Sequence, residues 1–151
     1  MNTLIFTALA GVIGTAGMSI ALWGVSHAGI ANAAMIRAIG SLFTHSYEDS
    51  FGLGLTVHFI VGIILAFVYV ALISLLEPVS LAGAIAYGGM IGLAHGVAFG
   101  FLLVIAVAEH HPLERFRNAG LEVAVAHLFG HVVYGVLVGL VVGLTGVRFF
   151  G

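Results

Sequence analysis

The sequence predicts an all-α integral membrane protein, with four transmembrane helices in a compact bundle and one short interfacial helix. The chain of 151 residues is 62% hydrophobic and only 7% charged, whereas a soluble domain carries about 25% charged residues. Its apolar residues form four stretches of the ~20 residues that a spanning helix needs, without the alternation of a membrane β-strand. The length suits a single membrane domain.

The four predicted spans cover about residues 3–25, 52–76, 81–108 and 121–147. Because backbone polar groups cannot stay unpaired in lipid, each span is expected to be helical. The first span has no positive residue before it and is longer than the apolar core of a signal peptide, which has about 7–15 residues. We therefore expect the first span to be retained.

A short amphipathic helix is predicted at about residues 31–45, between the first two spans. Its apolar residues recur at helical spacing, which is typical of a helix that lies at the membrane surface. These residues are Met35, Ile36, Ile39, Leu42 and Phe43. Glu77-Pro78 breaks the chain between the second and third spans, and a longer polar loop over residues 109–118 separates the third and fourth.

The few charges predict an orientation. Lysine is absent, and the loops after spans one and three hold Arg37, Arg115 and Arg117, while the other side holds Arg148 alone. The positive-inside rule places those two loops in the cytoplasm and both termini outside, and we expect a bacterial-type inner membrane.

The composition also excludes some classes of function and site. The chain has no basic patch that could bind nucleic acid. The absence of cysteine excludes disulfides and thiolate metal ligands.

Glycines recur every four residues along spans three and four, and in span two they flank His58 at four residues before it and four residues after it. This spacing lets membrane helices approach closely, because packing must replace the hydrophobic drive that lipid does not supply. Packing within one bundle is the favoured interpretation, and a seam that faces a second copy in a homo-oligomer is the alternative. The glycines are Gly54 and Gly62 in span two, Gly88, Gly92, Gly96 and Gly100 in span three, and Gly135, Gly139 and Gly143 in span four.

Four histidines, His58, His95, His127 and His131, lie inside the spans. Ionisable side chains at membrane depth are costly and rarely face lipid, so we expect them to face the bundle interior. His127 and His131 share a helix face, four residues apart. At 1.5 Å per residue, His95 and His131 form a deep pair and His58 and His127 a shallower one.

This cluster predicts a binding site for a metal or for haem. Neutral imidazole is a common ligand of copper, zinc and iron. Two histidines on separate helices also suit haem b, with His58 and His127 or His95 and His131 as the axial pair. Covalent c-type haem is excluded because the chain has no CxxCH motif. The leading hypothesis is a non-enzymatic membrane protein whose histidine cluster binds a metal or haem, and which could serve as an accessory subunit of a larger membrane redox complex.

Two alternatives stay open. The histidines could line the path of a small ion or proton transporter or channel, or they could be interhelical polar contacts in a structural assembly subunit. Glu122 lies about 180° around the helix from His131, which weakens a proton relay. Glu109, His110 and His111 form a weaker surface metal site and are more simply interpreted as solvated. An enzyme is not expected, because no nucleophile–base pair or paired carboxylates occur at useful spacing.

Two groups of residues carry a family resemblance. His58-Phe59 is followed by Ala66-Phe67-Val68-Tyr69, and span four contains Leu128-Phe129-Gly130-His131-Val132-Val133-Tyr134-Gly135. In these segments, which cover parts of three spans, the chain resembles the YagU-like family of small inner-membrane proteins of unknown function. The resemblance implies a compact polytopic fold, with histidines at the positions of His58 and His131.

Overall fold

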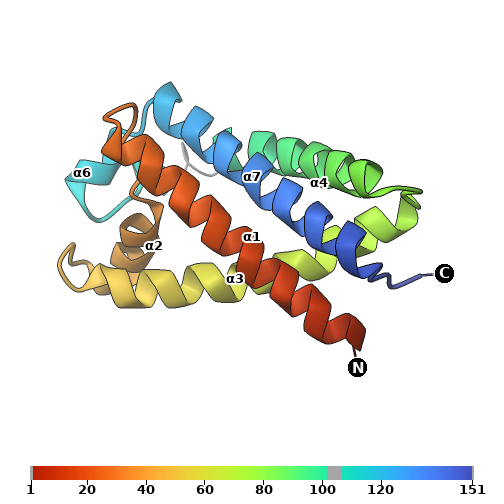
Figure 1. Cartoon of the computed structure of the whole chain (residues 1–151). Helices are drawn as coiled ribbons and strands as arrows, with labels where there is room; N and C mark the ends of the chain where they lie inside the picture. Colours follow the sequence, from red (N-terminus) through yellow and green to blue (C-terminus); the bar gives the residue numbers. More distant parts are fainter. Residues whose placement is uncertain (1, 102–106, 151) are drawn as a thin grey trace.

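The computed structural model describes residues 2–101 and 107–150, and no strand occurs among them. Four helical segments are long and apolar enough to cross a membrane, as the sequence predicts (Figure 1). They are α1 (Asn2–His27), α3 (Ser50–Leu75), α4 (Leu81–His95) with its continuation η1 (Gly96–Phe101), and α7 (Leu121–Thr145). Residues 102–106, which fall inside the predicted third span, lie outside the described residues.

Two short helices, α2 (Met35–Thr44) and α6 (Glu114–Arg117), lie between the long ones. The predicted interfacial helix therefore begins four residues later than expected. The amide of Ala33 donates to Ser26 Oγ at 3.0 Å, which ties the chain before α2 back to the end of α1. At its other end α2 stops at His45, whose φ of 52° is left-handed.

Glycines bring the backbones of α4 and α7 into contact. A Cβ atom added at Gly88 would collide with the carbonyl oxygen of Gly135, and one added at Gly135 would collide with that of Gly88. Gly139 lies in the same way against the carbonyl of Ala84. The predicted glycine seams therefore pack against each other within the chain.

The glycines of α3 face two other helices. A Cβ on Gly54 would collide with the carbonyl oxygen of Ile36 in α2, and one on Gly62 would collide with Thr15 Oγ1 of α1. These seams, like those of α4 and α7, are filled within one chain. The glycines of these seams pack against helices of the same chain, and association with a second copy stays a prediction.

The two ends of the bundle differ. The N-terminus, the C-terminal tail and the α3–α4 turn lie at one end, whereas α2 and α6 lie at the other (Figure 1). Arg148 donates to the carbonyl of Pro78 at 3.0 Å, and the amide of Phe149 donates to Ser74 Oγ at 3.2 Å. These bonds fasten the tail to the turn and close the first end.

At the second end the helices separate. Tyr134 of α7 donates to the carbonyl of Gly62 in α3 at 2.6 Å, so the two helices meet near their middles. From there α3 and α7 diverge toward α2 and α6 (Figure 1). The divergence leaves a space among the helices, and the predicted histidines lie around it.

Candidate functional site

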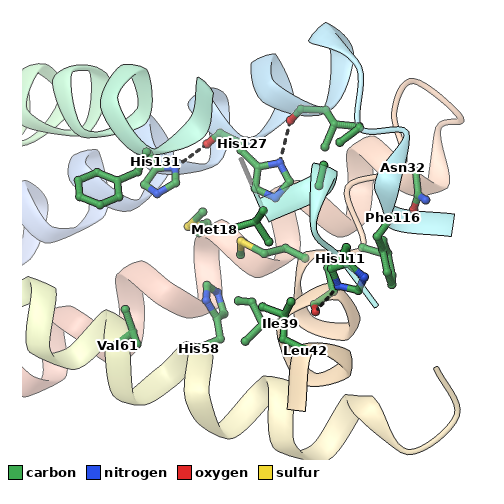
Figure 2. Close-up of a pocket in the computed structure, with 18 of the residues that line it drawn as sticks. Met18, Asn32, Ile39, Leu42, His58, Val61, His111, Phe116, His127 and His131 are labelled. Carbon is green, nitrogen blue, oxygen red and sulfur yellow. Dashed lines mark hydrogen bonds between the residues drawn. The ribbon is translucent and has the colours of Figure 1, made fainter. Parts of the chain in front are cut away.

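A cavity of about 430 Å³ occupies this space, within the range of small-molecule sites. All four histidines predicted from the sequence line it: His58 from α3, His95 from α4, and His127 and His131 from α7. Figure 2 shows His58 on the wall opposite His127 and His131. Most of the remaining lining is apolar, including Met18, Met35, Ile39, Leu42, Leu65, Phe99 and Val123.

The two histidines of α7 are held by their own helix. His127 Nδ1 lies 2.7 Å from the carbonyl oxygen of Val123, and His131 Nδ1 lies 2.7 Å from that of His127. Because a carbonyl can only accept, each Nδ1 carries the hydrogen and each Nε2 is left as an acceptor. No hydrogen bond within the described part of the chain engages either Nε2 atom.

His58 is the unsatisfied member of the cluster. Its side chain is 8% exposed, and its Nε2 atom is buried without a hydrogen-bond partner among the described residues. The ring projects from α3 into the cavity (Figure 2). A buried polar atom without a partner costs about 1–3 kcal/mol. Among the described residues, His58 is therefore the histidine of this cavity with a buried ring nitrogen that has no partner.

His95 extends the cluster toward the bundle centre. Its Nδ1 lies 2.8 Å from the hydroxyl of Tyr69, and its ring packs edge-on against that of His131, with centroids 4.4 Å apart. The contact confirms that His95 and His131 form a pair. Gly96 makes it possible, because a Cβ there would approach the Cβ of His131 to 3.1 Å.

Helix α4 changes character immediately after His95. Gly96–Phe101 form a π-helix, a rare conformation that often marks functional sites. Within it, Phe99 packs edge-on against His95 with ring centroids 4.8 Å apart and also lines the cavity. This segment is helical, as expected of the third span, but the change from α- to π-helix was not predicted.

A fifth histidine, His111, reaches the cavity from the loop before α6. It is 1% exposed, so the expectation of a solvated side chain is wrong. Its Nε2 bonds the carbonyl of Ala38 at 3.0 Å, and its Nδ1 accepts from the amide of Leu113 at 3.1 Å. Both ring nitrogens are engaged, so His111 fastens the loop to α2 and has no lone pair for a metal. Glu109 and His110 are exposed and do not line the cavity.

The histidines do not form a ready cage for a metal ion. In residues 2–101 and 107–150, no group of three or more His, Asp or Glu side chains is arranged to hold one. The imidazoles instead project from different walls of one apolar space (Figure 2). Glu122 does not line this cavity, as its position on the helix indicated.

Sequence reasoning missed two parts of the site. Met18 and Thr15 of α1 line the cavity. They were missed because span one carries no ionisable residue inside its apolar stretch that would mark it as part of a site. Arg115 of α6 also lines the cavity. In the sequence it served only to predict the orientation of the protein in the membrane. The chain matches none of the family models, curated proteins or solved structures with which it was compared. The resemblance to the YagU-like family therefore stays a prediction.

Proposed function

We propose that this chain is an integral membrane protein that binds haem b in the histidine-lined cavity. One observation carries the proposal: four imidazoles with unengaged Nε2 atoms surround a single, mostly apolar space. Apolar cavities with a few converging polar groups are the usual form of cofactor sites.

The orientation of the rings supports a role in ligation. Histidines that bind metals commonly donate their other ring N–H to a backbone carbonyl, which fixes the tautomer and aims the free nitrogen. His127 and His131 both make this bond. His58 Nε2 is the buried atom without a partner, and coordination to iron would satisfy it. We therefore assign His58 as the principal axial ligand, with His127 or His131 on the facing wall.

The arrangement favours haem over a bare metal ion. Protein sites for zinc and similar ions use three or four side-chain ligands, and the described residues offer no such group. The porphyrin supplies four nitrogen ligands itself, so iron needs only one or two imidazoles from the protein. Its apolar macrocycle also suits the aliphatic and aromatic lining of this cavity.

The outer surfaces of the long helices support insertion in a bilayer. Large apolar side chains remain exposed along α3, including Ile60, Ile64 and Val68, and lipid is the solvent that suits them. Arg37, Arg115 and Arg117 belong to the end that carries α2 and α6, which the positive-inside rule assigns to the cytoplasm. A haem carrier with so little mass outside the bilayer would suit a subunit of a larger redox complex.

The test is a titration of the detergent-purified protein with haemin, followed by the Soret band. We expect saturation at one haem per chain, with His58→Ala weakening the affinity at least tenfold. His27→Ala is the matched control, because His27 stacks on Trp23 and does not line the cavity. Saturable binding that survives His58→Ala, His127→Ala and His131→Ala would contradict the proposal. Stoichiometric copper or zinc in place of haem would favour a metal site.

A further inference from the structure

We infer that the cavity takes an amphipathic acid and that Arg115 binds its carboxylate; for haem b this group is a propionate. The inference rests on the proposed function and adds a second contact, distant from His58. The inference concerns the part of the ligand that lies near Arg115. The histidines do not determine the chemistry of that part.

The cavity is long and its ends differ chemically. Its lining on α7 runs from Val123 to Tyr134, which at 1.5 Å per residue is about 16 Å. One end, near Val61 and His131, lies among the long helices, and the other, near Asn32 and Phe116, lies among the loops (Figure 2). A ligand that fills the cavity therefore has one end among helices and one at the loops.

Charge is confined to the loop end. Arg115 lines the cavity there, and no Asp or Glu from the described ranges lines it. The side chains of Asn32 and Asn118, which add amide donors, are exposed, as is Arg115. An apolar cavity that ends in a cation and two amides is complementary to a molecule with an apolar body and an anionic end.

The Arg115 guanidinium is held in place without being neutralised. Its central carbon lies 3.6 Å from the centroid of the Tyr47 ring, and no carboxylate of the described residues pairs with it. The guanidinium of Arg37 lies 4.6 Å from the same centroid. The two like charges are therefore no more than about 8 Å apart and repel each other. A bound carboxylate would offset this repulsion, which a neutral ligand cannot do.

The experiment compares haemin with haemin dimethyl ester, in which the propionates carry no charge. We expect the wild type to bind haemin about three- to tenfold more tightly than the ester, the range for one partly exposed charge pair. Arg115→Gln should remove this preference, and Arg115→Lys should retain part of it. Arg117→Gln is the matched control, because Arg117 donates to the carbonyls of His111 and Pro112 and does not line the cavity.

The possible outcomes separate the two proposals. Equal affinity of the wild type for both porphyrins, or a preference that survives Arg115→Gln, overturns the role of Arg115 and leaves haem binding intact. Absence of saturable binding of either porphyrin overturns both. Because the readout is a ratio of affinities within each variant, a general loss of stability in Arg115→Gln does not mimic the expected result.

Discussion

At the scale of single residues, the histidines of the cavity differ in how many of their ring nitrogens hydrogen bonds engage. His111 uses both nitrogens in bonds to the backbone, whereas His127 and His131 use only Nδ1. His58 Nε2 has no partner among the described residues. Five histidines line one cavity, and their hydrogen bonds assign them different roles.

Replacement of His58 should separate stability from binding. In the haem-free protein, His58→Phe removes a buried nitrogen whose lack of a partner costs about 1–3 kcal/mol. We therefore expect an unchanged or higher Tm in detergent, together with weaker haemin binding. A large fall in the Tm of the haem-free variant would show that the nitrogen is already satisfied, contrary to this account.

His111→Phe is expected to behave in the opposite way. The substitution leaves the amide of Leu113 without its acceptor and removes one donor to the carbonyl of Ala38, which keeps the bond from Ser41 Oγ. The free energy of unfolding should therefore fall by about 1–3 kcal/mol. Because His111 offers no free lone pair, the Soret position should stay that of the wild type. Thermal unfolding and absorption spectra of the same sample measure both effects.

Sequence reasoning identified His58, His95, His127 and His131 because each interrupts a long apolar stretch. The role of His111 had no comparable signal: the run His110-His111-Pro112 is typical of an exposed loop. Its partner, the carbonyl of Ala38, is 73 residues away in the chain. Hydrogen bonds to distant backbone atoms leave no periodic trace in the sequence, so only the fold could show them.

At the scale of the elements, glycine spacing predicted close packing but not the partners. The spacing along α4 and α7 marks one smooth face on each helix, and the structure pairs those faces. Gly54 and Gly62 of α3, which are eight residues apart, contact α2 and α1 instead. The π-helix η1 was not predictable, because its sequence continues the apolar pattern of α4.

The glycine contact between α4 and α7 can be tested with one methyl group. Gly135→Ala places a Cβ against the carbonyl of Gly88, so the helices must separate and the protein should lose about 1–3 kcal/mol. Gly24→Ala in α1 is the matched control, because a Cβ there meets no atom within 4 Å. Thermal unfolding of both variants is the measurement. Equal stability of the two would show that α4 and α7 are not in backbone contact.

At the scale of the whole molecule, α2 and α6 lie at the end of the bundle away from the two termini (Figure 1), and residues of both helices line the cavity. The positive-inside rule predicts that this end faces the cytoplasm. The number of spans was predictable from apolar length alone. The cavity could not be predicted from apolar length. It arises because α3 and α7 diverge between the contact of Tyr134 with Gly62 and the end that carries α2 and α6.

Labelling of single introduced cysteines tests the orientation. Because the chain contains no native cysteine, only the introduced thiol of this protein can react with the maleimide. Val79, which is fully exposed, lies in the α3–α4 turn, and Glu114 lies at the start of α6, at the opposite end of the bundle (Figure 1). In intact spheroplasts we expect a membrane-impermeant maleimide to label Val79→Cys, and to label Glu114→Cys only after lysis. The reverse pattern would invert the orientation, and labelling of both without lysis would contradict insertion.

The central claim is that His58, His127 and His131 surround a haem. The most direct measurement is the haem content of the protein extracted from membranes of haem-replete cells with a mild detergent, compared with that of His58→Ala. We predict about one haem b per chain in the wild type, because the histidines of one cavity supply the one or two imidazoles that one haem iron needs. The His58→Ala variant should contain substantially less than one haem per chain. A well-folded wild-type protein that contains no haem and shows no saturable Soret change with added haemin would contradict the account.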